Sequence, residues 1–132
     1  MKLTTSLAAL LLILNLVGCK NDADKQMSDV TEKQKDMVNV LRSVKDKDSA
    51  KAANDKLKAI AKDMADILEQ SKKTNPSQAE QKRIVEKYKP AQEQAQKDMQ
   101  AEMLRVMQIP GAMQEMTEGF REIGSIAQRG NR

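Results

Sequence analysis

Cysteine and histidine are nearly absent from this chain. Cys19 is its only cysteine, and it has no histidine. An intrachain disulfide needs two cysteines, so it is excluded, and so are a Cys/His zinc site and a His-based triad or acid–base relay. Carboxylate pairs remain, such as Asp63 with Asp66 and Glu115 with Glu118, but they lie off the apolar positions among Lys and Gln. That setting is typical of solvated helix faces, so we expect no catalytic residues and no enzyme.

Methionine is the other residue type that could bind a ligand. Met99, Met103 and Met107 are spaced i, i+4, i+8, and Met113 and Met116 follow shortly after. Thioethers are soft ligands that suit Cu(I), so a soft-metal or small-ligand carrier is one hypothesis. Methionine is also a flexible core filler, and these positions coincide with apolar stripes needed for packing. Core packing is therefore the favoured interpretation, followed by an adaptable face for a partner helix and then by copper.

The N-terminal residues form a more specific pattern. Lys2 precedes a run from Leu7 to Val17 that is apolar apart from Asn15, and charged sequence begins at Lys20. About eleven apolar residues fit the h-region of a signal peptide and fall short of the roughly 20 that span a bilayer. The residues Leu16-Val17-Gly18-Cys19 then resemble the lipobox of bacterial lipoproteins, with a permitted residue at every position.

This resemblance implies that a signal peptidase cuts between Gly18 and Cys19. It also implies a diacylglyceryl group on the sulfur of Cys19 and an N-acyl group on the new N-terminus. Two or more acyl chains make a stable membrane anchor, so the folded part needs no lipid affinity of its own. The implied location is the bacterial cell envelope. Lys20 replaces the Asp common in relatives retained at the inner membrane, which favours the outer membrane if the source is Gram-negative.

The rest of the chain is rich in strong helix formers and poor in aromatic residues, which make up 2 %. Apolar residues recur at helical spacing in four stripes. They are Met27, Val30, Gln34, Met37, Leu41 and Val44; Ala53, Leu57, Ile60, Met64 and Ile67; Val85, Tyr88, Gln92, Ala95 and Met99; and Met113, Met116, Phe120, Ile123 and Ala127. Each helix is too polar to be stable alone, so we expect the stripes to pack together.

Breaks between the stripes predict the helix ends. Asp29 with Glu32 forms a possible capping box for the first helix. The stripes change phase at residues 45–49, which predicts a turn with Asp46 or Asp48 as the cap of a new helix.

Prolines and glycines mark the later breaks. Asn75 as N-cap and Pro76 at the first helical position predict the third helix, supported by Ser77 followed by Glu80. The stripe keeps its phase past Pro90, which predicts a kink rather than a reversal. The sequence IPGA at 109–112 ends that helix.

These patterns predict an all-α protein, a small antiparallel bundle of three or four helices. Residues 1–18 are the expected signal peptide, 19–26 the lipidated cysteine and a polar tether, 27–128 the helical domain and 129–132 a frayed tail. The net charge is only +4, which indicates no nucleic-acid partner. We expect a lipid-anchored envelope protein that acts by binding or scaffolding, with the membrane and an unknown envelope protein as partners.

Overall fold

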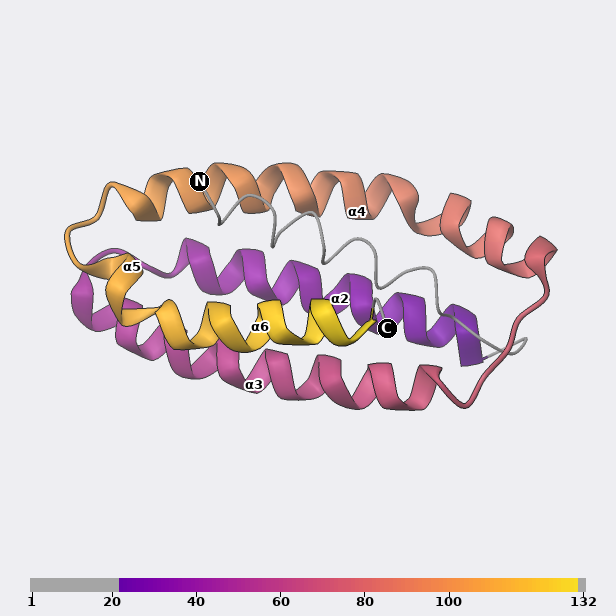
Figure 1. Ribbon diagram of the computed structural model, residues 1–132. Coiled ribbons are helices and arrows are strands. Elements are labelled where there is room, and N and C mark those ends of the chain that lie inside the picture. The colour runs from indigo at the N-terminus through magenta and orange to yellow at the C-terminus, as the bar shows by residue number, and fades with distance from the viewer. Residues whose placement is uncertain (1–21, 131–132) are drawn as a thin grey trace.

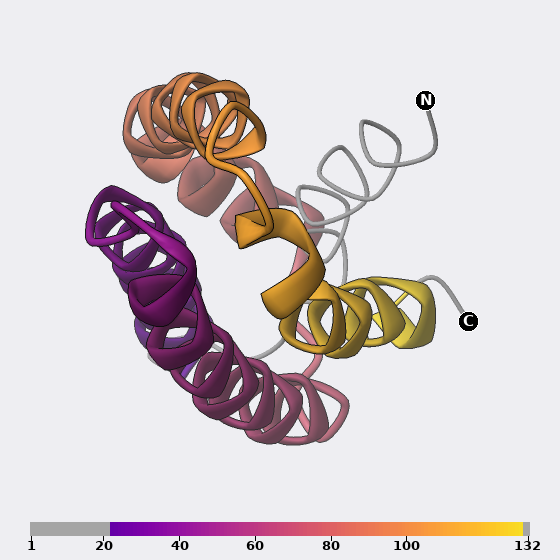
Figure 2. The ribbon, with the colours of Figure 1, turned by 90° about the vertical axis from the view of Figure 1, so that its left-hand side faces the viewer.

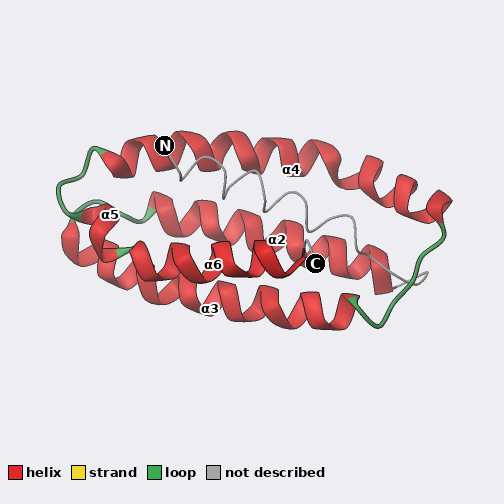
Figure 3. Cartoon of the chain, in the orientation of Figure 1, coloured by secondary structure: helices red, strands yellow, loops and turns green. Residues whose placement is uncertain are grey.

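The computed structural model describes residues 22–130 of the chain, and these residues contain helices and turns but no strand. The helices are α2 (Asp22–Arg42), α3 (Lys47–Ser71), α4 (Gln78–Met107), the single turn α5 (Ala112–Glu115) and α6 (Thr117–Gly130) (Figures 1 and 3). The predicted all-α bundle is therefore confirmed for the described part of the chain.

Successive long helices alternate in direction along the bundle (Figure 1). The most extensive packing, however, joins helices that run parallel, α2 with α4 and α3 with α6, while α2 and α3 form an antiparallel hairpin. Viewed end-on, α4, α2, α3 and α6 follow one another around an arc, with α5 at the near end (Figure 2). Helices α4 and α6 thus flank the α2–α3 hairpin on its two sides, each parallel to the helix that it packs against.

One apolar core connects all these helices. Its fully buried side chains include Leu41, Leu57, Val106 and Met116, and every member of the first predicted stripe is buried. The third stripe needs a correction at its start, because Ile84 is buried whereas Val85 is 37 % exposed. These neighbours lie about 100° apart on the helix, and only Ile84 faces α2.

The first helix begins earlier than predicted, at Asp22 instead of Met27. Residues 22–26, expected in the tether, are helical because they pack on α4: Ala23 and Met27 form a small buried cluster with Ile84. Asp24 also lies 2.9 Å from the ammonium of Lys87. The Asp29–Glu32 pair consequently lies inside the helix and caps nothing at its start.

The predicted turn at residues 45–49 is confirmed. Asp46 is the N-cap of α3 and accepts a hydrogen bond from the Ser49 backbone N–H at 2.8 Å, and the Ser49 hydroxyl accepts one in return from the Asp46 N–H. At the start of α4 the N-cap is Ser77, whose hydroxyl accepts from the Glu80 N–H at 3.3 Å, so the predicted Asn75 cap is wrong. Ser77 has the extended backbone that an N-cap requires.

Proline and glycine explain two further features of the backbone, a bend within α4 and the turn that follows it. Helix α4 runs through Pro90 without reversing, as predicted, and its first turns bend away from the axis of the rest in Figure 1. Gly111 has a φ of 78°, a left-handed conformation that turns the chain from α4 into α5. Helix α6 continues to Gly130, so residues 129 and 130, expected in the frayed tail, are helical.

Candidate functional site

The residues predicted to be processed, Gly18 and Cys19, lie outside the described residues. The first described residue is Asp22, the start of α2, three positions after Cys19. Its other candidate features are the methionines, an exposed apolar pair on α4 and a groove between α2 and α4.

The methionines do not share one face. Met99 and Met103 are buried, with 7 % and 6 % of their surface exposed, and Met116 is fully buried in the same core. Met107 is 58 % exposed. Each step of four residues rotates a side chain by about 40° around the helix, so Met107 has turned about 80° away from Met99. Most of these thioethers are therefore packing groups of the core.

An exposed apolar pair lies at the C-terminal end of α4. Leu104 is 63 % exposed and lies three residues before Met107, so the two side chains are neighbours on one face. Sequence reasoning had placed Met107 with the other methionines and had not identified Leu104. Large exposed apolar side chains next to each other are a feature of contact surfaces.

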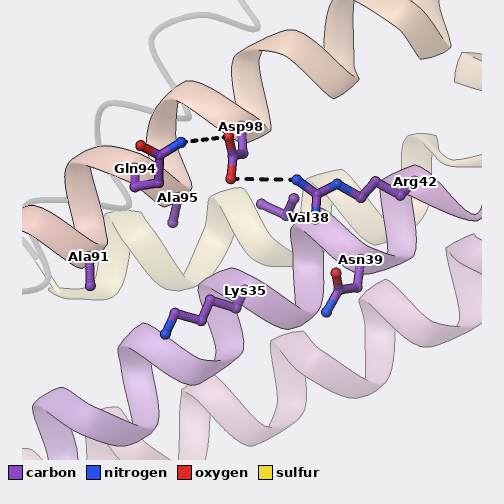
Figure 4. Close-up of a pocket in the computed structure, with 8 residues that line it drawn as sticks. All are labelled: Lys35, Val38, Asn39, Arg42, Ala91, Gln94, Ala95 and Asp98. Atoms are coloured by element: carbon purple, nitrogen blue, oxygen red, sulfur yellow. Dashed lines mark hydrogen bonds and ion pairs between the residues drawn. The ribbon is translucent and has the colours of Figure 1, made fainter.

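A groove of about 400 Å³ lies between the parallel helices α2 and α4 (Figure 4). Its floor is apolar, formed by Val38 of α2 with Ala91 and Ala95 of α4. The two alanines are four residues apart and leave the space that larger side chains would fill. Around the floor lie Lys35, Asn39, Arg42, Gln94 and Asp98.

Charges at the groove are paired at one end only. Arg42 lies 3.5 Å from Asp98, whose other oxygen accepts a hydrogen bond from the Gln94 amide at 2.9 Å. Lys35 is exposed and makes no ion pair with any described residue. A free ammonium beside an apolar floor fits a small molecule that has a carboxylate or phosphate and a short apolar part.

Arg105 anchors the far end of this helix pair, a role that sequence reasoning missed. Its guanidinium donates to the backbone carbonyls of Val44 at 2.8 Å and Leu41 at 2.7 Å, where α2 ends. It also donates to Glu102 at 2.7 Å. Carbonyls at a helix C-terminus lack partners within the helix, so Arg105 acts as a cap supplied by α4.

Of the carboxylates singled out in the sequence, Asp63, Glu115 and Glu118 are partners of lysines. Asp63 accepts a hydrogen bond from Lys33 at 2.8 Å, which raises the pKa of Lys33. Glu118 accepts one from Lys58, and this bond lowers the pKa of Glu118. Within residues 22–130, no group of three or more His, Cys, Asp or Glu side chains could hold a metal ion.

The chain matches no protein family, no curated protein and no solved structure. Over the same described residues, no helix has the length and apolar character needed to cross a membrane.

Proposed function

We propose that the protein is a lipid-anchored helical protein of the bacterial cell envelope that acts by binding another protein. The observation that carries the anchor is the sequence Leu16-Val17-Gly18-Cys19, which resembles a lipobox and follows an apolar segment of h-region length. Acylation of Cys19 would supply membrane attachment, leaving the helical bundle free to make contacts in the aqueous space.

The contact role is supported by the exposed pair Leu104 and Met107. Both side chains leave more than half of their surface in water, and among the other large apolar side chains of residues 22–130 only Val85, at 37 %, is exposed. Burying them in a partner would recover about 25 cal/mol for each Å² of apolar surface covered. Methionine also adapts to differently shaped partner surfaces.

Two measurements test this proposal. Intact mass of the native protein should equal a chain beginning at Cys19 plus a diacylglyceryl and an N-acyl group; an uncleaved leader or a free thiol would refute the anchor. For the contact role, Leu104→Glu should abolish capture of a specific partner from solubilised native membranes, whereas the exposed neighbour Gln100→Glu should not. Equal capture by both variants would refute the role of this pair.

A small-ligand carrier is the second candidate, and the groove between α2 and α4 is the observation that favours it. The ligand would place its anionic group near Lys35 and its apolar part over Ala91 and Ala95. Hexanoate should then bind more tightly than hexyltrimethylammonium, and Ala95→Leu should abolish binding by filling the floor. The burial of Met99 and Met103 gives no support to the copper version of this hypothesis.

A further inference from the structure

The start of α2 restricts how the protein can sit on a membrane. Asp22 is the first residue of the helix and lies three positions after Cys19. Three Cα–Cα steps of a trans chain span about 11 Å at most. We propose that the anchored protein stands on the bilayer with one end of the bundle against the lipid headgroups, an inference that rests on the proposed acylation of Cys19. We define this base as the start of α2, residues 72–77 and the first turns of α4.

Within the base, the start of α2 packs closely on α4. Ala23 and Met27 leave at most 1 % of their surface exposed and pack on Ile84 of α4. On the surface, Lys87 donates to both oxygens of Asp24, at 3.0 and 2.9 Å. Because this turn is part of the packed bundle, Cys19 can lie no farther from the bundle than three extended residues allow, about 11 Å.

The base also has a suitable charge for an anionic headgroup surface. Asp24 of the base is paired with Lys87, and Lys72 of the base is paired with Glu69 near the end of α3. The exposed cations of the base without an ion pair among the described residues are Lys25, Lys73, Lys82 and Arg83, against the carboxylates Asp22, Glu80 and Glu86. Basic residues near a leaflet that contains anionic lipid are attracted to it.

The long side of the bundle lacks such an excess of positive charge. Lysines on the exposed face of α3 alternate with carboxylates, as in Lys51, Asp55, Lys62 and Asp66. Between α2 and α3, Lys33 is paired with Asp63. Headgroups therefore favour the base over the side, and the tether already holds the base close to them.

This orientation places the α5 end far from the membrane. Helix α4 runs from the base to that end (Figure 1), and its 30 residues span about 45 Å. Leu104 and Met107 lie in its last turns. In this orientation the exposed apolar pair therefore faces the aqueous space and lies away from the lipid. The anchor and the contact surface thus occupy opposite ends of the molecule.

The test uses the full lipidated protein in vesicles, with one cysteine introduced at Asn75→Cys or, as the matched control, at Gln108→Cys. Both positions are exposed and flank α4 at its two ends. Acylation consumes the Cys19 thiol, so a fluorophore labels only the introduced cysteine. Lipids with a nitroxide on the headgroup should quench the label at position 75 strongly and the label at position 108 hardly at all.

Equal quenching at both positions, or stronger quenching at 108, would overturn the orientation. Vesicle flotation and intact mass, measured on the same samples, separate this result from failure of the anchor. A protein that floats with the vesicles and carries lipid supports anchoring through Cys19, whatever quenching the two labels show. Absence of lipid on Cys19 would overturn both.

A charge-reversed variant tests the electrostatic part. Lys73→Glu with Lys82→Glu should reduce quenching at position 75 on vesicles that contain phosphatidylglycerol, but not on vesicles of phosphatidylcholine alone. Unchanged quenching on the anionic vesicles would refute the contribution of these cations.

Discussion

Gly119 lies at a close approach of α6 to α3, and replacing it with alanine tests that contact. A Cβ at Gly119 would lie 2.7 Å from the Cβ of Leu57, 3.0 Å from the side-chain oxygen of Asn54 and 3.1 Å from the backbone oxygen of Asn54. Carbon atoms pack best at about 3.5–4.0 Å. A Cβ moves only with its backbone, so the helices would have to separate.

The expected magnitude combines three contributions. In an open helix interior, alanine in place of glycine stabilises by about 1 kcal/mol. Against this, overpacking a tight contact costs about 1–3 kcal/mol. Separation would also stretch the hydrogen bond from the Gly119 N–H to the Asn54 side-chain oxygen, now 2.8 Å, and a buried donor without a partner costs about 1–3 kcal/mol. We expect Gly119→Ala to reduce the free energy of unfolding by about 1–5 kcal/mol, the sum of these contributions.

The assay is urea unfolding of the fragment that begins at Lys20, and circular dichroism at each urea concentration measures the fraction that remains helical. Asn54→Ala isolates the hydrogen bond and should cost about 1–3 kcal/mol. Ser125→Ala on the exposed side of α6 is the control, with an expected change within about 0.5 kcal/mol. A Gly119→Ala protein as stable as the parent would show that helix propensity outweighs the contact, and the close approach of α3 and α6 would be refuted.

The same urea assay checks three further predictions. Met103→Ala should cost about 2–5 kcal/mol because its side chain is buried in the core, whereas the exposed Met107→Ala should change stability by less than about 0.5 kcal/mol; similar losses would contradict the assigned faces. Arg105→Met keeps the apolar stem but removes the cap on α2, so we expect a loss of about 1–2 kcal/mol, and no loss would show that water replaces the guanidinium. Gly111→Ala should be less stable than Gly111→Asn, because asparagine tolerates the left-handed backbone better, and the reverse order would refute the strain.

Local patterns in the sequence were enough to predict the helices and one of their caps. The period of apolar residues from Met27 to Val44 reports which side faces the core, and the Asp46–Ser49 pair is a cap formed within four residues. Both features depend only on residues that are close together in the chain, so they can be predicted from the sequence. The proposed lipidation of Cys19 is likewise a local motif, and it stays a prediction.

Features set by tertiary contacts could not be predicted in the same way. Residues 22–26 are polar in sequence, and only their packing on Ile84 and Lys87 makes them helical. Ile84 and Val85 are both apolar, and periodicity alone does not choose between them. The cap from Arg105 joins residues 61 and 64 positions apart, and the groove floor depends on which alanines face α2.

Specific polar contacts fix both ends of the bundle. Near the α5 end, Arg105 fixes α4 to α2, and Asn54 fixes α6 to α3. At the base, Lys87 of α4 donates to both oxygens of Asp24 of α2. Between the two ends, two buried polar groups are less well satisfied: the Gln34 side-chain oxygen has no hydrogen-bond partner among the described residues, and the Gln92 amide donates to the thioether of Met27. Because specific bonds fix helix register while buried groups without good partners cost stability, the contacts near the α5 end help to set the positions of α4 and α6 on the α2–α3 hairpin. Leu104 and Met107 lie at that end, so the proposed contact surface stands beside one of these sets of fixed contacts.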